Sequence, residues 1–214
     1  MSRIREVNGG GAQVVEAYER RSIERRSGEI QSKAGSGNGS IIAPRLSIDE
    51  SLLIDAKSLF IGSKIGEGAH GKVYEGRFGE RIVAIKVLHR GSTSDERSVL
   101  ENRFAREVNM MSKVKHENLV KFIGACKDPL MAIVTELLPG MSLRKFLFSI
   151  RPNKLELPLA LSFALDIARA MECLHANGII HRDLKPGTLI YMSRDYFPSC
   201  KSCIVLIKMA GYVF

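Results

Sequence analysis

The sequence predicts an α+β fold, in which a strand-rich lobe with one helix is followed by a helical lobe. Short Val- and Ile-rich segments separated by glycine turns lie between residues 59 and 88, and a helix pattern follows them. The longest helix pattern comes later, at residues 158–175, and no repeat of fixed period is present. With 214 residues, 45% of them apolar, the chain is long enough for two such lobes with a buried core.

Residues 1–58 are expected to form a flexible tail and a lead-in to the folded part. Residues 9–11 and 35–40 have the glycine- and serine-rich composition of flexible linkers. Residues 12–26 would form at most a charged helix with a thin apolar face. The segment Ser47-Ile48-Asp49-Glu50 has the pattern of a capping box, which predicts a short helix leading into the domain.

Three strands are expected next, at residues 59–62, 72–75 and 81–88. The glycine motif G-x-G-x-x-G-x-V occupies residues 66–73, between the first two strands. Dinucleotide-binding folds require a helix directly after such glycines, whereas here a strand follows. Glycines between two strands let the backbone close over phosphate groups, although an ordinary hairpin turn also fits this motif alone.

Lys86 stands at the end of the apolar strand segment Val83-Ala84-Ile85-Lys86. A buried ammonium must be paired, and such a lysine would bind the α- and β-phosphates of ATP, unless it points outward from an edge. The next helix, expected at residues 100–114, offers Glu107 as the partner, or as a carboxylate reaching water. Glu107 shares a helix face with Leu100, Phe104 and Met111.

The second lobe is expected to begin after two further strands, at residues 119–126 and 130–135. Pro139-Gly140 breaks the chain, and Ser142 would cap a short helix through Phe148. The helix at residues 158–175 starts with a proline and ends before Asn177-Gly178. Its two apolar stripes predict a core helix: Leu161, Ala164, Ala168 and Met171 form one, and Phe163, Ile167, Ala170 and Leu174 form the other.

The most specific motif is His181-Arg182-Asp183-Leu184-Lys185-Pro186. Asp183 would accept or orient the proton of a substrate hydroxyl, and Lys185 would neutralise charge on a phosphate in transfer. A polar loop without catalytic function is the alternative. It explains poorly why this motif follows both the glycine motif and the lysine strand in one chain.

Residues 60–74, 116–120 and 124–126 resemble the plant Raf-like group of tyrosine-kinase-like serine/threonine protein kinases. The resemblance covers about residues 53–186 and implies a protein-kinase-like fold, ATP and Mg²⁺ as cofactors, and phosphoryl transfer to protein hydroxyls in signalling. Lys185 indicates serine/threonine specificity. The resemblance implies that the backbones of Glu136 and Leu138 bind the adenine edge, behind which Thr135 would guard the pocket. The segment taken alone fits an ordinary strand end better. The implied ATP-binding residues are Ile65, Gly66, Glu67, Gly68, Ala69, His70, Gly71, Val73, Ala84, Lys86, Glu107, Thr135, Glu136 and Leu138.

The sequence departs from this family after Pro186, so a kinase domain is expected at residues 59–186 and a divergent tail at residues 187–214. Thr188 replaces the asparagine of H-R-D-L-x-x-x-N, and Gly211-Tyr212 stands where Asp-Phe of D-F-G is expected. No A-P-E motif follows. These departures predict a C-terminally truncated member with an incomplete helical lobe, an incomplete magnesium site and impaired catalysis. The alternative is a non-catalytic module that binds nucleotide or a partner kinase.

Composition sets the remaining expectations. Residues 1–60 hold nine Lys and Arg against eight Asp and Glu, so most of the +9 charge lies in the folded part. Such charge suits nucleic acid, acidic lipid or polyphosphate, but no nucleic-acid recognition motif is present, so a solvated basic surface is expected. No apolar run is long enough for a membrane span, and a cytoplasmic protein is expected. The resemblance implies a protein substrate or a partner kinase. Cys200 and Cys203 lack the second pair that a zinc site requires.

Overall fold

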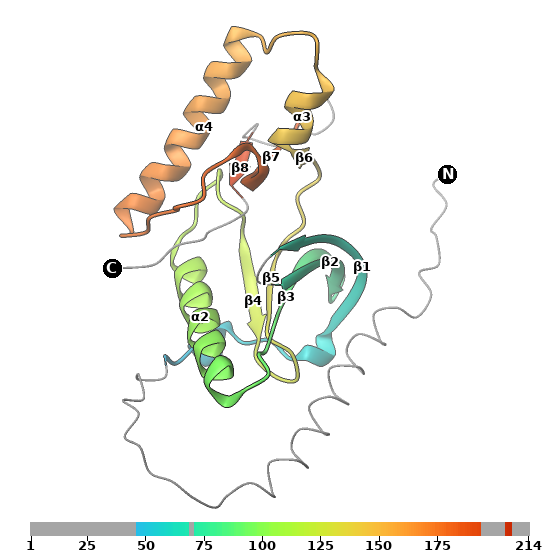
Figure 1. The fold of residues 1–214 in the computed structure, drawn as a ribbon, viewed down its shortest axis with the longest axis vertical. Coiled ribbons are helices and arrows are strands. Elements are labelled where there is room, and N and C mark those ends of the chain that lie inside the picture. Colours follow the sequence, from blue (N-terminus) through green and yellow to red (C-terminus); the bar gives the residue numbers. More distant parts are fainter. Residues whose placement is uncertain (1–45, 69–70, 194–203, 207–214) are drawn as a thin grey trace, which may run out of the picture. The chain divides into compact units, whose positions relative to one another are not determined.

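The computed structural model describes residues 46–68, 71–193 and 204–206 (Figure 1). The chain divides into two compact units. The first comprises Met1–Ala105 and Gly124–Val134, and the second comprises Arg106–Ile123 and Thr135–Phe214. The possible helix at residues 12–26 lies outside the described residues.

The lead-in to the first unit consists of two short 3₁₀ helices, η2 (Glu50–Leu52) and η3 (Ala56–Ser58). Their N-caps are Asp49 and Asp55, whose side chains accept hydrogen bonds from the backbone N–H two residues further on, each at 2.9 Å. The predicted short helix is therefore present as η2, but its N-cap is Asp49 and not Ser47. An aspartate that bonds two residues on closes a tight turn, and this local bond competes with a longer helix.

The strands form a five-stranded sheet in the order β1-β2-β3-β5-β4 (Figure 1). Its members are β1 (Leu59–Gly68), β2 (Gly71–Phe78), β3 (Arg81–Leu88), β4 (Phe122–Cys126) and β5 (Ala132–Glu136). Every predicted strand of this lobe is present. The first two are longer than predicted because their pairing continues up to Gly68 and Gly71. In β3, Val83, Ile85 and Val87 alternate into the core, as the period of a strand requires.

Helix α2 (Ser94–Lys113) starts six residues before the predicted residue 100. The hydroxyl oxygen of Thr93 accepts the N–H of Glu96 at 3.2 Å. The Glu96 carboxylate in turn accepts the N–H groups of Ser92 and Thr93 at 2.8 and 3.3 Å. These two N–H bonds lower the pKa of Glu96. Thr93 and Glu96 thus form the capping box that starts the helix.

The second unit contains two helices and a three-stranded sheet in the order β6-β7-β8 (Figure 1). The predicted caps are confirmed: Ser142 Oγ accepts the N–H of Lys145 at 3.2 Å, and Gly178 has a φ of 69° just after the long helix. The elements are β6 (Met141–Ser142), α3 (Leu143–Ser149), α4 (Leu157–Ala176), η4 (Pro186–Thr188), β7 (Leu189–Tyr191) and β8 (Ile204–Leu206).

Only one of the two apolar stripes of α4 is covered. Phe163, Ala170 and Leu174 are buried, whereas Leu161 is 61% exposed and Ala164 and Ala168 are exposed as well. The prediction of a core helix is therefore confirmed for the stripe of Phe163 and wrong for the stripe of Leu161. Among the described residues, no helix combines the length and the hydropathy that crossing a lipid bilayer requires.

Candidate active site

The glycine motif and the lysine strand are aligned by strand register in the first unit. Gly66 is paired with Val73 across β1 and β2, and Val73 is paired with Lys86 across β2 and β3. Directly paired residues of antiparallel strands lie on the same face of a sheet. Gly66, Val73 and Lys86 therefore form a row on one face of the hairpin, opposite the face that carries the buried Val83, Ile85 and Val87.

Lys86 does not lie on an edge strand, which excludes the alternative of an outward-pointing edge lysine. Its strand, β3, lies between β2 and β5 in the sheet. Lys86 and Ala84 are both half-buried, because they alternate with the buried residues of β3. A lysine on a central strand whose face is only partly covered can present its ammonium to an anion while its methylene groups pack on the sheet.

Gly68 and Gly71, where the β1–β2 hairpin turns, have two different functions. A side chain at Gly71 would place its Cβ 2.1 Å from the carbonyl oxygen of Val87, so only glycine lets β2 approach β3 there. Among the described residues, and leaving out the chain neighbours of Gly68, no atom lies within 4 Å of the position that a Cβ of Gly68 would take. The open backbone at Gly68 has room for a phosphate, and this observation fits ATP. Ala69 and His70 lie outside the described residues.

Glu67 cannot serve phosphate binding through its side chain. Its carboxylate forms an ion pair with Lys64 Nζ at 2.9 Å, and both side chains are exposed. The hydrogen bond from Lys64 lowers the pKa of Glu67, and the charges of Lys64, Lys72 and His89 add to this effect. A carboxylate that stays ionised repels phosphate, so only the backbone of Glu67 suits an ATP site. Ile65, also predicted for this site, is 49% exposed on β1.

Glu107 lies on α2 in the second unit, whereas Lys86 lies in the first. Glu107 is half-buried, and its predicted face neighbours Phe104 and Met111 are buried, while Leu100 is half-buried. Glu107 therefore lies on the predicted apolar face of α2. The pairing of Glu107 with Lys86 stays a prediction.

Thr135, Glu136 and Leu138 are half-buried at the end of β5 and just beyond it. The N–H of Glu136 donates to the carbonyl of Lys121 at 3.0 Å, and the Glu136 carboxylate accepts the N–H of Lys121 at 2.8 Å. The N–H of Glu136 is thus committed to the sheet. Its carbonyl accepts a long bond of 3.3 Å from the Thr135 hydroxyl, and a carbonyl oxygen has a second lone pair that suits an adenine amine.

The loop at residues 181–188, called the catalytic loop below, brings Asp183 and Lys185 together in the second unit. Lys185 Nζ lies 2.7 Å from Asp183 Oδ1, and the two side chains are 57% and 27% exposed respectively. The buried His181 accepts the N–H of Asp183 through Nδ1 at 3.3 Å. Arg182 has a φ of 60°, which is uncommon outside glycine and clusters at functional sites. The loop thus presents a carboxylate and an ammonium at hydrogen-bond distance.

The hydroxyl of Thr188 forms hydrogen bonds with the backbone of this loop, a role that the sequence did not predict. This hydroxyl is buried, and its single proton is shared between the carbonyls of Lys185 and Asp183, at 2.8 and 3.2 Å. The same oxygen accepts the N–H of Lys185 at 3.2 Å. A hydroxyl has one proton and two lone pairs, so these contacts use most of its bonding capacity. The available signal was that a short polar residue after a turn often bonds the nearby backbone.

The structure describes one of the two positions that hold magnesium in kinases, and Thr188 at that position supplies no amide oxygen. In kinases the metal is held by the catalytic-loop asparagine and by the aspartate of D-F-G. Thr188 replaces that asparagine, and its oxygen is already bonded within the loop. Within the described ranges, no group of three or more His, Cys, Asp or Glu side chains is placed to hold a metal ion. Gly211-Tyr212 and the pair Cys200 and Cys203 lie outside those ranges.

Strand β8 is held from two sides by residues that the sequence did not single out. The N–H of Ile204 donates to Asp166 Oδ2 of α4 at 3.0 Å, and its carbonyl accepts from Asn118 Nδ2 at 3.0 Å. Asp166, Asn118 and Ile204 are all buried. Strand β8 comprises Ile204–Leu206, and residues 207–214 lie outside the described residues.

Comparison with known proteins gives a consistent result. Residues 59–193 match the family of protein tyrosine and serine/threonine kinases. The chain is 42% identical over 138 residues to the Arabidopsis thaliana serine/threonine/tyrosine-protein kinase HT1, covering 64% of this chain and 35% of that protein. It is 44% identical over 138 residues to the serine/threonine-protein kinase STY46 of the same plant, with coverages of 64% and 23%. The chain thus spans about a quarter to a third of the length of these relatives.

Proposed function

The chain belongs to the protein tyrosine and serine/threonine kinase family, and from this premise we propose that it is an ATP-binding member of the plant Raf-like group with impaired phosphoryl transfer. Its kinase domain comprises residues 59–186, preceded by a tail and lead-in at residues 1–58 and followed by a divergent segment at residues 187–214. Two observations support this proposal. In the glycine hairpin, Gly66, Val73 and Lys86 form a row on one face of the sheet. In the catalytic loop, the hydroxyl of Thr188 is hydrogen-bonded to the loop backbone.

ATP binding is assigned to the residues that the hairpin and the end of β5 present. The open backbone around Gly68 would cover the phosphates, and Lys86 would pair with the α- and β-phosphates. The carbonyl of Glu136 and the backbone of Leu138 would bind the adenine edge. Glu107 is proposed to fix the ammonium of Lys86, as in other kinases.

Asp183 and Lys185 would act on the protein substrate and on the phosphate in transfer. The carboxylate of Asp183 would orient the hydroxyl of a substrate serine or threonine and accept its proton. Lys185 would reduce the negative charge on the phosphate, while its bond to Asp183 fixes both side chains. General-base assistance of this kind contributes about 10²- to 10⁴-fold to a rate.

Thr188 carries the proposal that catalysis is impaired. Magnesium supplies charge neutralisation to the phosphates when a kinase binds it, and Thr188 does not offer the amide oxygen that holds it. Loss of a metal ligand removes several kcal/mol of stabilisation, so transfer is expected to be at least roughly a hundredfold (~3 kcal/mol) slower than in a relative with asparagine. The same observation favours a second candidate function, a module that binds nucleotide or a partner kinase without transfer.

The decisive experiment measures transfer of labelled phosphate from Mg-ATP to a generic protein substrate, with Asp183→Ala beside the unaltered chain. We expect weak transfer from the unaltered chain. Strong transfer that Asp183→Ala abolishes would contradict the impairment. A thermal-shift titration with ATP then separates the two candidates from an inert chain, because a bound ligand stabilises the folded state by mass action.

A further inference from the structure

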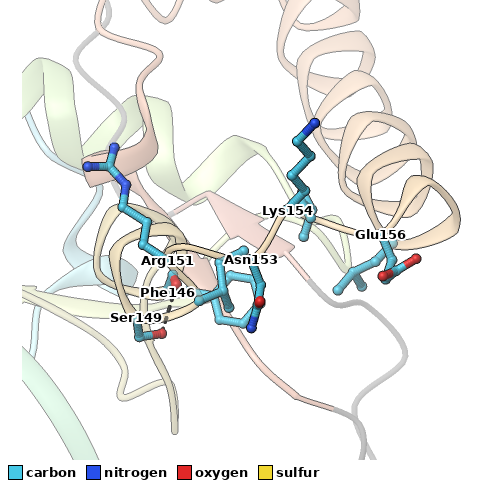
Figure 2. Close-up of a pocket in the computed structure, with 9 residues that line it drawn as sticks. Phe146, Ser149, Arg151, Asn153, Lys154 and Glu156 are labelled. Atoms are coloured by element: carbon cyan, nitrogen blue, oxygen red, sulfur yellow. Dashed lines mark hydrogen bonds between the residues drawn. The ribbon is translucent and has the colours of Figure 1, made fainter.

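A pocket of about 260 Å³ opens where α3 passes into α4 in the second unit (Figure 2). Pockets that enclose small-molecule ligands usually measure about 300–1,000 Å³, so this one suits one or two side chains of a peptide. None of the residues around it belongs to the proposed ATP or catalytic site. They are Phe146, Ser149, Ile150, Arg151, Asn153, Lys154, Leu155, Glu156 and Leu159.

The apolar wall of the pocket is rigidly supported. It consists of the half-buried side chains of Phe146, Ile150, Leu155 and Leu159. The ring of Phe146 packs on Tyr191 of β7 with centroids 4.0 Å apart, and on Phe163 of α4 at 6.0 Å. A wall fixed by such aromatic contacts loses little entropy when a ligand side chain packs on it. The pocket is therefore suited to receive an apolar side chain.

The rim of the pocket is basic. Arg151 and Lys154 belong to the rim, and in Figure 2 their side chains extend to the same side of the connection, away from the Glu156 carboxylate. Arg144 and Lys145 of α3 add two more exposed cations. Glu156 is the only acidic residue between residues 143 and 156. Within the described part of the chain, none of these four cations has an ion pair.

Two of the cations are held in place by an exposed aromatic ring. Phe148 is 53% exposed, and the guanidinium groups of Arg151 and Arg144 lie 4.4 and 5.9 Å from its centre. Stacking on a ring leaves the N–H groups at the edge of a guanidinium available to a carboxylate or a phosphate. The rim is thus arranged to bind anions.

Helix α3, whose C-terminal part lines the pocket, belongs to the same unit as Asp183 and Lys185. Helix α3 packs against η4, which directly follows Lys185, and against β7. A peptide bound along α3 would therefore lie on a helix that contacts η4, the turn directly after Lys185.

We propose that this basic-rimmed pocket docks an acidic linear segment of a protein substrate or partner kinase. An apolar side chain of the segment enters the pocket, and its neighbouring carboxylates or phosphates bind Arg144, Arg151 and Lys154. The proposal rests on the proposed function only in that the ligand is a protein. Nucleic acid fits less well, because a phosphate backbone offers nothing to fill an apolar pocket lined by phenylalanine and leucine.

The first test uses the full chain and fluorescein-labelled twelve-residue peptides that carry a pair of leucines beside a run of four glutamates, in both orders. Fluorescence anisotropy should show binding of at least one order. Replacing glutamate by glutamine, or leucine by serine, should each weaken binding by at least about tenfold. A version with phosphoserine in place of glutamate shows whether carboxylate or phosphate is the better anion. Binding that survives both replacements would overturn the proposal.

The second test changes the protein. Arg144→Glu combined with Arg151→Glu should weaken peptide binding by at least about tenfold. Arg169→Glu is the matched control, because Arg169 is an exposed cation of α4 outside the pocket. Leu155→Ser tests the apolar wall, and thermal unfolding verifies that each variant is folded. Equal weakening by Arg169→Glu, or equally tight binding of single-stranded DNA that needs the same arginines, would contradict a peptide-docking pocket. Neither result depends on ATP binding or transfer, which the thermal-shift and transfer assays test separately.

Discussion

The glycine hairpin of the first unit and the catalytic loop of the second bring their functional residues together by different physical means. In the hairpin, strand register alone places Gly66, Val73 and Lys86 in one row. In the loop, Asp183 and Lys185 are held by their ion pair and by backbone bonds that end on Thr188. A site built by register tolerates change at most other positions, whereas a site built by loop contacts depends on individual side chains. Thr188, which replaces the asparagine of the family motif, lies in the site that is built by loop contacts.

The largest expected effect separates chemistry from nucleotide binding. Asp183→Ala should reduce the remaining phosphoryl transfer by at least about a hundredfold, because it removes the base. The ATP-induced thermal shift should stay unchanged, since the hairpin is intact. Labelled-phosphate transfer and thermal unfolding measure the two effects. Glu172→Ala, an exposed residue of α4, is the control and should alter neither. Unchanged transfer in Asp183→Ala would remove this aspartate from the mechanism.

The next effect tests the row on the hairpin. Lys86→Met should weaken ATP binding by about tenfold or more, because a charge-assisted bond to phosphate is lost. Lys72 offers a matched control, since it is paired with Val87 and so lies on the opposite face of the same hairpin. Lys72→Met should leave the affinity unchanged. Isothermal titration calorimetry measures the ATP affinity of both variants. An equal loss of affinity in both would show that ATP binding does not depend on which face of the hairpin carries the lysine.

The third effect concerns the stability of the catalytic loop. Thr188→Val keeps the volume of the side chain but removes a buried hydroxyl that bonds three backbone groups. The free energy of unfolding should fall by about 1–3 kcal/mol, the cost of leaving buried polar groups without partners. Denaturant unfolding followed by circular dichroism measures it. Thr135→Val loses one bond of 3.3 Å and should cost less. A similar loss in both variants would mean that Thr188 has no special place in the loop.

The smallest effect is on cysteine reactivity. Burial raises the pKa of Cys126 to about 11, and the charges of Asp128 and Asp55 add to the shift. The folded state therefore keeps the neutral thiol, so its stability is unaffected below the ordinary pKa of the thiol and declines as the pH rises from there towards about 11. At pH 8, iodoacetamide should alkylate Cys173, which is partly exposed, before Cys126. Mass spectrometry of the two peptides checks the order, and faster labelling of Cys126 would contradict its burial.

Much of the fold follows from local pattern. Strand β3 has the predicted bounds, and the caps at Ser142 and Gly178 lie at the predicted positions, because alternation and capping depend on neighbours in sequence. The start of α2 was missed because the capping box of Thr93 and Glu96 lies within a segment that is polar throughout. The exposed stripe of α4 could not be predicted, because an apolar stripe does not reveal what covers it.

The sequence by itself determined the family, the order of the motifs and the identity of Asp183, Lys185 and Lys86, since these depend on residue type and spacing. Tertiary structure decided three other matters. It placed Lys86 on a central strand, it committed the hydroxyl of Thr188 to the loop backbone, and it fixed β8 between Asp166 and Asn118. Each of these depends on which atoms meet at hydrogen-bond distance. That distance is set by packing between segments far apart in the chain or by the path of a loop, and neither has a periodic signal in the sequence.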